Sequence, residues 1–432
     1  MRFMHIADVH LGYQQYGLKE RFDDFSKVFL HLIDEAVDQE VDFVLLAGDL
    51  FEKRAVEPLA MRVAIAGLQT LKKAGVPVLA VEGNHEKAYY REQTSWMDFL
   101  DALGYLRLLN PRFEGGRAVL EPHGADGGAY VDLAGGVRVY GLRYYGASMA
   151  KALQSVTEAL ANHDDAVVHY TILMLHAGLE GQLAHIGRLK YRDIAPLRDR
   201  VDYVALGHIH KPYRVEDWIY NPGSPETCGI DETAWPQRGC YLVDITPDHN
   251  PRHRAKLVVP PRRPFHRLRL EVDAATEPSA VYDTVRALIR RERAHIDDTS
   301  KPVVELTLSG TLPFNRYDLD VAHIQDLLET AWQPLTARVR NLTMPTEFEV
   351  RFDEESSRPE LERAILRDLL ERDVRYRDDA EAWTEGALAL KQLVLERSAP
   401  EAVVDHLRQL SSELPSGPGS SEDAGLAEGE SI

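Results

Sequence analysis

Short apolar runs recur along the first part of the chain and alternate with segments of helical periodicity. Between the first two runs, apolar residues fall at helical spacing from Phe25 to Val37. Between the next two, Pro58 suits a first helical turn and Gly75 a helix end. Strands that alternate with helices predict a layered α/β core over residues 1–260. The runs expected to form buried strands are Arg2–Ala7, Val41–Leu46, Val76–Val81, Val137–Leu142, Thr171–Leu175 and Val201–Leu206.

The pattern changes near residue 260. The stretch Arg252–Arg269 holds seven basic residues and no acidic one, and prolines interrupt it. Beyond it, strand and helix patterns alternate, which predicts a small α+β domain over residues 265–352. Residues 357–410 are rich in Arg and Glu with apolar positions at helical spacing, and residues 411–432 have the Gly/Ser/Pro/acidic composition of a disordered tail. The elements expected in the small domain are strands at 265–272, 302–310 and 346–352 and helices at 280–294 and 321–331.

Composition narrows the class of protein. The chain of 432 residues is 44% hydrophobic and 28% charged, as in globular proteins with a large core. No apolar run approaches the roughly 18 residues that span a bilayer, and the first residues are too few and too polar for a signal peptide. With only Cys228 and Cys240, the sequence allows two buried thiols or one pair, and we expect a reduced, cytoplasmic protein.

The net charge of −19 argues against attraction of nucleic acid by the molecule as a whole. The acidity is uneven, however. Residues 251–300 carry 11 basic against 7 acidic residues, a balance of +4, whereas residues 401–432 carry 1 against 7, a balance of −6. A nucleic-acid surface would therefore be local.

Side chains that can bind metal ions follow five of the apolar runs, in FMHIADVH, FVLLAGDLF, VLAVEGNHE, TILMLHAG and VALGHIH. Ligands of open α/β folds bind beyond the carboxyl ends of the strands, so we expect these side chains to converge on one edge of the sheet. In Asp-x-His and His-x-His, alternate side chains share one side of an extended backbone. The candidate ligands are Asp8, His10, Asp49, Asn84, His176, His208 and His210.

The chemistry of these side chains indicates the kind of ion. Carboxylate, imidazole and amide oxygen, without thiolate, suit Mn²⁺, Fe²⁺ or Zn²⁺. Seven donors exceed the needs of one tetrahedral zinc and suit two octahedral ions completed by water, with Asp49 as the natural bridge. Each motif alone has a structural alternative, since GNHE could be a capped turn and His176 a satisfied core histidine. Their conjunction, each after an apolar run, favours the metal site.

The series D-x-H, GD, GNHE, H and GHIH resembles the calcineurin-like metallophosphoesterase superfamily. The stretches HIADVHLGYQQYG, GDLF, HAGLEG, GHIHKPY and YNPGSPE narrow the resemblance to the nuclease subunit of the double-strand-break repair complex, the SbcD-like type. The likeness is strong over residues 1–245 and weaker beyond. It implies a two-sheet layered core, with residues 265–352 as a cap over DNA and residues 357–410 as helices that grip the coiled coil of an SbcC-type ABC ATPase. The alternative for these helices is packing on their own nuclease domain.

The resemblance also implies a cofactor and an activity. Relatives use Mn²⁺, cleave DNA ends as an exonuclease and single strands as an endonuclease, and form homodimers. We therefore expect two Mn²⁺ per chain, with Fe²⁺ or Zn²⁺ as alternatives, and a water between the ions that attacks phosphorus in line. The implied roles place Asp8, His10 and His210 on the first metal, Asn84, His176 and His208 on the second, Asp49 between them and His85 on the phosphate and leaving oxygen.

One position departs from the family pattern. Many relatives carry His or Asp directly after GDLF, where this chain has Glu52. Glu86 also follows a metal motif, and it could orient the ring of His85 or simply begin a helix. Basic and aromatic residues after the metal motifs are expected to rim a DNA cleft, with solvated loop charges as the alternative. These residues are Lys53, Arg54, Lys87, Tyr89, Tyr90 and Arg91.

Two other functions are compatible with parts of the sequence. A phosphatase or phosphodiesterase of the same superfamily would act on protein or small substrates, but phosphoprotein phosphatases carry GD-x-V-D-R-G where this chain has GDLF. A scaffold that tethers DNA ends would have a vestigial metal site, which the full set of donors disfavours. The sequence thus favours an ATPase-coupled DNA nuclease.

Overall fold

The computed structural model describes residues 1–88, 94–163, 168–183, 189–246, 248–293, 295–296, 300–345, 358–372, 376–395, 403–406 and 408. The chain divides into two compact units, residues 1–265 and residues 266–432. Within the described ranges, no helix has both the length and the apolar character needed to cross a membrane. The expectations for Tyr89, Tyr90, Arg91, the strand at 346–352 and the tail from 411 lie outside the described residues.

The first unit contains two six-stranded sheets. The first sheet has the order β14-β13-β1-β2-β3-β4, in which β1 to β4 run parallel and β13 and β14 antiparallel. Helices cross over between its parallel strands, which places the carboxyl ends of β1, β2 and β3 side by side. The elements are β1 Arg2–Ile6, α1 Lys19–Asp38, β2 Phe43–Leu46, α2 Pro58–Lys73, β3 Val78–Ala80, α3 Trp96–Ala102, β4 Arg107–Leu108, β13 Cys240–Ile245 and β14 His253–Val258.

The second sheet has the order β11-β12-β10-β9-β8-β7. Its strands β8, β9, β10 and β12 run parallel, while β7 and β11 are antiparallel edges. A small hairpin of β5 and β6 lies apart from it. The elements are β5 Arg112–Glu114, β6 Arg117–Val119, β7 Tyr130–Leu133, β8 Val137–Leu142, α4 Met149–Ala161, β9 Tyr170–His176, α5 Tyr191–Ile194, β10 Tyr203–Gly207, β11 Tyr213–Val215 and β12 Ile219–Asn221.

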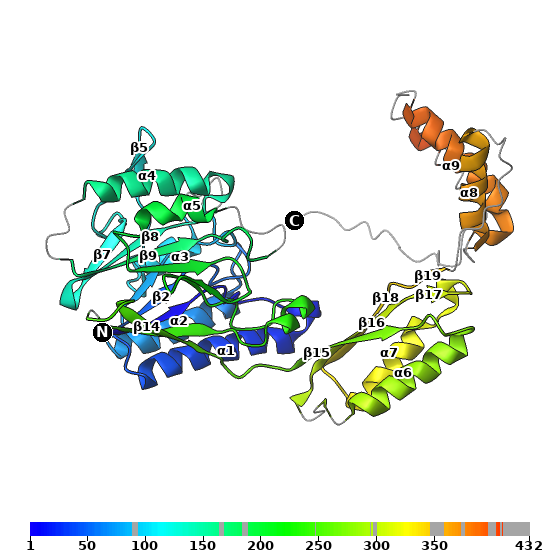
Figure 1. The fold of residues 1–432 in the computed structure, drawn as a ribbon, viewed down its shortest axis with the longest axis horizontal. Helices are drawn as coiled ribbons and strands as arrows, with labels where there is room; N and C mark the ends of the chain where they lie inside the picture. The colour runs from blue at the N-terminus through cyan, green and yellow to red at the C-terminus, as the bar shows by residue number, and fades with distance from the viewer. Residues whose placement is uncertain are drawn as a thin grey trace, which may run out of the picture. The chain divides into compact units, whose positions relative to one another are not determined.

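The two sheets pack face to face between outer helices (Figure 1). Because successive side chains of a strand point to opposite faces, Phe3 enters the core between the sheets whereas Met4 and Ile6 face α1 and α2. On the other side, Leu173 and Leu175 pack with α4 and α5. This two-sheet layered α/β core confirms the fold class expected from the sequence, and each of the six expected strands overlaps an observed one.

The second unit contains a small α+β domain. Its three-stranded sheet has the order β15-β16-β18, with β16 and β18 parallel, and apolar residues of α6 and α7 pack against it. The strand β18 was not expected, since its sequence TARVRN is largely polar. The elements are β15 Phe265–Glu271, α6 Pro278–Glu292, β16 Val303–Ser309, β17 Thr311–Leu312, α7 Val321–Trp332, β18 Thr336–Asn341 and β19 Met344–Pro345.

Two further helices follow, α8 Arg358–Arg372 and α9 Ala380–Leu395. Ion pairs join them, with Arg363 contacting Glu381 at 2.7 Å and Arg367 contacting Glu381 at 3.2 Å. Several apolar side chains of this helix pair remain exposed, among them Ile365, Leu369, Val394 and Leu395. The pair therefore has an apolar surface that its own contacts leave uncovered.

Candidate metal centre

The expected metal ligands converge where the carboxyl ends of both sheets meet. Asp8 and His10 follow β1, Asp49 follows β2 and Asn84 follows β3, all in the first sheet. His176 ends β9, and His208 and His210 follow β10, in the second. The expectation of a single sheet edge was thus wrong, because the site joins two sheets. Asp8 spans this junction, since both oxygens of its carboxylate accept the backbone N–H of His208, at 2.9 and 3.0 Å.

The backbone turns sharply at the residues that carry these side chains. Asp8, His10, Asp49 and His208 all have positive φ values, of 53°, 53°, 52° and 88°. The sequence-based expectation of an extended backbone at Asp-x-His and His-x-His was therefore wrong. Non-glycine residues in this region cost about 1–3 kcal/mol each and cluster at functional sites. Ile209, between the two histidines, is buried in the helix-side core and points away from the site.

Asp49 lies at the centre of the arrangement. A carboxylate oxygen of Asp49 lies within 4.8 Å of ligand atoms of Asp8 and His10. A carboxylate oxygen of Asp49 also lies within 4.8 Å of ligand atoms of His176 and His208. One oxygen accepts the backbone N–H of His85 at 3.0 Å, and the other lies 3.2 Å from Nε2 of His176. Although burial opposes ionisation, the nearby imidazoles, His176 first, hold the pKa of Asp49 well below its ordinary value. The geometry therefore presents one carboxylate to two neighbouring groups of donors.

The group on the second-sheet side is fixed by backbone contacts. His176 is fully buried, and its Nδ1 donates to the carbonyl of Ala47 at 2.7 Å, which leaves Nε2 to face the site. The amide oxygen of Asn84 lies 3.1 Å from that Nε2 and 2.8 Å from Nδ1 of His208. Burial lowers the pKa of His176, but Asp49 outweighs it and raises the value to about 9. Burial and the neighbouring His176 lower the pKa of His208 to about 4.

The group on the first-sheet side pairs two imidazoles. Nε2 of His10 faces Nε2 of His210 at 3.1 Å. Nδ1 of His210 lies 2.7 Å from a carboxylate oxygen of Glu232, in the short helix η5 Ile230–Ala234, and Nδ1 of His10 lies 2.9 Å from a carboxylate oxygen of Glu52. Carboxylates behind ligand histidines orient their rings and increase their basicity. Glu52, whose role the sequence left open, thus lies behind His10.

His85 is partly open to solvent, with 33% of its side chain exposed. Its Nδ1 lies 2.5 Å from the backbone carbonyl of Glu52, and its ring meets that of His10 edge to face, with centroids 4.9 Å apart. If Nδ1–H of His85 donates to the carbonyl of Glu52, the other ring nitrogen, Nε2, points away from that carbonyl. Glu52 therefore contacts both His10 and His85, through its side chain and its backbone respectively.

Glu86 has a different role from those considered for it above. Its buried carboxylate accepts four backbone N–H groups, from Asp49 at 3.1 Å, Leu50 at 2.6 Å, Phe51 at 3.1 Å and Gly83 at 2.9 Å. These bonds join the loop after β2 to the loop after β3. Burial and the charge of Asp49 raise the pKa of Glu86 to about 8. Sequence reasoning missed this role because backbone donors leave no signature in the sequence.

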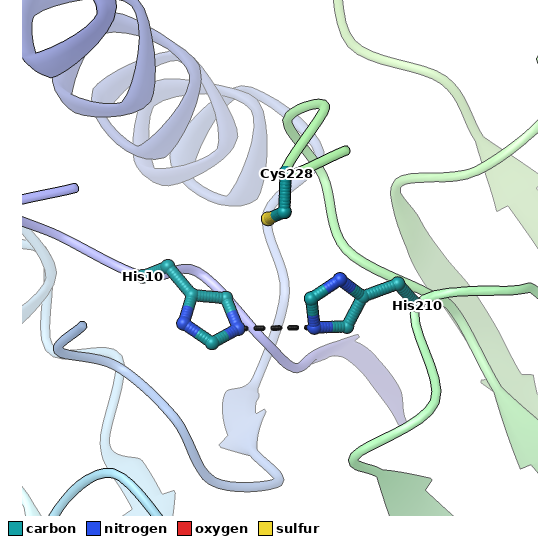
Figure 2. Close-up of side chains that lie close together, drawn as sticks. All are labelled: His10, His210 and Cys228. Atoms are coloured by element: carbon teal, nitrogen blue, oxygen red, sulfur yellow. Dashed lines mark hydrogen bonds between the residues drawn. The ribbon is translucent and has the colours of Figure 1, made fainter. Parts of the chain in front are cut away.

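The centre also contains a thiol and a phenol that sequence reasoning missed. Cys228 and Cys240 are both free. Figure 2 shows the Cys228 thiol beside the facing rings of His10 and His210, and the three ligand atoms lie within 4.8 Å of one another. The sequence did not indicate that a thiol lies next to the expected donors. The ring of Tyr144, which follows β8, lies 5.2 Å from that of His208.

These residues fit a pair of divalent cations. The donors are carboxylates, imidazoles and an amide oxygen, the set that suits borderline-to-hard ions. The donors approach the backbone so closely that a side chain would not fit at two neighbouring glycines. A Cβ at Gly83 would lie 2.0 Å from Oδ1 of Asp49. A Cβ at Gly48 would stand 2.2 Å from Nδ1 of His176, and Gly48 also has a positive φ of 88°. Both loops must therefore carry glycine for Asp49 and His176 to approach each other.

Three of the basic residues expected at the rim are exposed near this centre. They are Lys53, Arg54 and Lys87. Arg54 and Lys87 line one pocket of about 180 Å³ together with Glu86 and Trp96, and Nζ of Lys87 lies 5.0 Å from the ring centroid of Tyr144. Some arginines of the basic stretch Arg252–Arg269 form ion pairs with aspartates of the first unit. Arg263 pairs with Asp24 at 2.6 Å, and Arg252 pairs with Asp202 at 3.1 Å.

Comparison with known proteins shows what this chain is similar to. Residues 1–212 match the calcineurin-like phosphoesterase family. The DNA double-strand break repair protein Mre11 of Aeropyrum pernix is 27% identical over 323 residues, which are 73% of this chain and 75% of that protein. The Mre11 proteins of Haloferax volcanii and Archaeoglobus fulgidus are 33% and 31% identical over 57% and 54% of this chain. The aligned parts are 50% and 52% of those two proteins, so the chain spans about half their length.

Proposed function

Because residues 1–212 match the calcineurin-like phosphoesterase family, we propose that the chain is a metal-dependent DNA nuclease of double-strand-break repair. We propose exonuclease activity on duplex ends and endonuclease activity on single strands. The observation that carries the proposal is the position of Asp49, which belongs to two adjoining groups of buried metal donors. The names of the relatives support DNA as the substrate.

The proposed cofactor is a pair of Mn²⁺ ions, with Fe²⁺ or Zn²⁺ as alternatives. When bound, such ions neutralise the charge of a phosphate and lower the pKa of water, so that a phosphodiester can be attacked near neutral pH. Asp49 would contact both ions. The remaining donors would be Asp8, His10 and His210 for the first ion and Asn84, His176 and His208 for the second.

His85 is the proposed acid of the reaction. It is partly exposed, and the carbonyl of Glu52 holds its Nδ1, which leaves Nε2 as the atom that can reach a substrate. A protonated ring there would stabilise charge on the phosphate and donate its proton to the leaving sugar oxygen. The carboxylates of Glu52 and Glu232 would keep the rings of His10 and His210 in place during this step.

The rim of the centre supplies the proposed DNA contacts. Lys53, Arg54 and Lys87 are exposed close to the metal-bearing loops, and we include Tyr89 and Arg91, which follow Lys87 in the sequence. Contacts from such residues to phosphates would set the register of the DNA without reading its sequence.

The experiment that tests the function is a Mn²⁺-dependent cleavage assay on blunt duplex, hairpin DNA, single strand and bis-p-nitrophenyl phosphate. The wild-type chain should cleave DNA, and His85→Gln and Asp8→Ala should abolish cleavage while the circular dichroism spectrum stays unchanged. His31→Gln, an exposed histidine of α1, is the matched control and should retain activity. Activity on the small ester alone would favour a phosphodiesterase of small substrates, and inactivity on every substrate a tethering scaffold.

We further propose that α8 and α9 bind the coiled coil of an SbcC-type ABC ATPase. The exposed side chains of Ile365 and Leu369 on α8 and of Val394 and Leu395 on α9 support this proposal, because an amphipathic partner helix can cover such a surface. The small α+β domain would act as the cap over DNA.

A homodimer is also proposed, through the first unit. On α3, Trp96 is 40% exposed and Phe99 41%, and Leu103 directly after it is 46% exposed. Large apolar side chains gathered on one short helix are typical of a surface that another copy covers.

A further inference from the structure

We propose that Cys228 is a thiolate ligand of the first metal position, beside His10 and His210, and that this position takes a thiophilic divalent cation such as Zn²⁺ or Fe²⁺. The inference rests on the dimetal centre of the proposed function and names an additional ligand for one of its two positions. Carboxylate and imidazole donors alone suit Mn²⁺, whereas a thiolate shifts the preference toward softer ions.

The positions of the donor atoms support the assignment. Figure 2 shows the Cys228 thiol directed toward two imidazoles whose Nε2 atoms face each other at 3.1 Å. Two ligand atoms of one ion, each about 2.1–2.3 Å from it, can be at most about 4.6 Å apart. The ligand atoms of Cys228 and the two histidines lie within 4.8 Å of one another, so only a small movement would bring all three onto one ion.

The facing imidazoles point to a cation as well. Because Nδ1 of His210 bonds to Glu232 at 2.7 Å, a neutral His210 has its lone pair on Nε2, directed at Nε2 of His10. The side chain of His10 is 97% buried, since only 3% of it is exposed. The two Nε2 atoms, 3.1 Å apart, are close enough to share a hydrogen, and they are also close enough to bind one ion side by side. The thiol of Cys228 lies beside them.

The chain also holds Cys228 in place through its backbone. Its N–H donates to Oε2 of Glu232 at 2.9 Å, and its carbonyl accepts Nε2–H of Gln15 at 2.9 Å. The other oxygen of Glu232 lies against His210, so one carboxylate positions both proposed ligands. The thiol contacts the ring of His210 and lies 3.8 Å, at Sγ, from the carbonyl of Glu226. The sulfur is therefore held beside one of the proposed ligand histidines.

Ligation would change the bonding at sulfur without any redox step. The S–H bond of Cys228 breaks, the proton leaves to solvent, and a sulfur lone pair forms the bond to the cation, so that no electron is gained or lost.

The test is Co²⁺ titration of the full-length chain, followed by absorption spectroscopy. Bound Co²⁺ gives weak visible d–d bands with any donor set, and a thiolate ligand adds a strong near-ultraviolet sulfur-to-cobalt charge-transfer band. The chain has only two cysteines, so Cys240→Ala leaves Cys228 as the single thiol and should keep the band. Cys228→Ser should lose the band, keep d–d bands, and bind Zn²⁺ at least about tenfold more weakly in calorimetry.

Each other outcome is decisive. Visible d–d bands without the charge-transfer band, in the wild type and in Cys240→Ala, would overturn the role of Cys228 and leave the dimetal centre standing. A charge-transfer band that persists in Cys228→Ser would also overturn the role of Cys228 as a ligand. A chain that binds neither Co²⁺ nor Zn²⁺ would refute the metal centre itself. If Cys228→Ser fails to fold, the spectrum of Cys240→Ala decides alone.

Discussion

Replacing Glu86 by Gln tests whether one buried carboxylate holds the metal-bearing loops together. The side chain accepts four backbone N–H groups, two at each oxygen. Gln keeps the oxygen that meets Leu50 and Phe51, but its NH₂ group would face the N–H groups of Asp49 and Gly83. Each buried donor left without an acceptor costs about 1–3 kcal/mol. The variant should therefore lose about 4 kcal/mol of the free energy of unfolding.

The loss should be measured above pH 8, where the carboxylate of Glu86 is ionised, since its pKa is raised to about 8. Urea unfolding gives the change in stability of the chain, and hydrogen exchange read by mass spectrometry reports on the two loops. About 4 kcal/mol corresponds to roughly thousandfold faster exchange of the amides of Asp49 and Gly83, if they exchange by local opening. Mn²⁺ affinity should fall by about 10- to 100-fold, because the loops that carry Asp49 and Asn84 separate.

The matched control is Glu82→Gln. Glu82 is a buried carboxylate in the same loop, bonded to Arg143 at 3.3 Å, and burial raises its pKa, so that a neutral amide suits its site. Its replacement should change the free energy of unfolding by less than about 1 kcal/mol. Equal effects of the two substitutions, with unchanged exchange of the loop amides in Glu86→Gln, would refute the reasoning.

Three further outcomes are expected. Phe99→Glu should convert the proposed dimer to a monomer in sedimentation, because a charge opposes burial of that apolar surface, and a dimer that persists in the variant would place the interface elsewhere. Deleting residues 357–432 should abolish co-purification with the ATPase while the first unit stays folded, and continued binding would contradict the role of α8 and α9. Between pH 7 and 5 the free energy of unfolding should fall by about 2 kcal/mol for each of His5 and His253, as urea unfolding can measure. Burial lowers the pKa of these histidines to about 3 and about 4, so below about 6.5 only the unfolded chain takes up their protons, and a flat profile would show that they are solvated.

The convergence of the candidate metal donors could be predicted from the sequence because of the parallel strands. Apolar runs marked β1, β2, β3, β9 and β10, and donors at their carboxyl ends meet wherever such strands lie side by side. The sequence did not reveal that His208 bonds to Asp8, 200 residues earlier, across two sheets. It also suggested an extended backbone at Asp8 and His10, where the chain turns with positive φ.

Residues whose partners are distant or belong to the backbone could not be predicted. Glu86 binds N–H groups that every residue but proline offers, so no spacing reveals it. Cys228 and Glu232 reach the centre through the loop after β12, which has no periodic pattern. The strand β18 escaped notice because its alternate side chains are arginines.

The origin of the donors in two sheets has a consequence for how long the folded chain survives. Four of the seven candidate donors come from the first sheet and three from the second, so ions bound by them would link the two sheets. By mass action, an ion present at one hundred times its dissociation constant stabilises the folded state by about 2.7 kcal/mol at each site. The supply of divalent cations should therefore set resistance to proteolysis as well as activity, and a chain deprived of metal should be degraded sooner than one with a full centre.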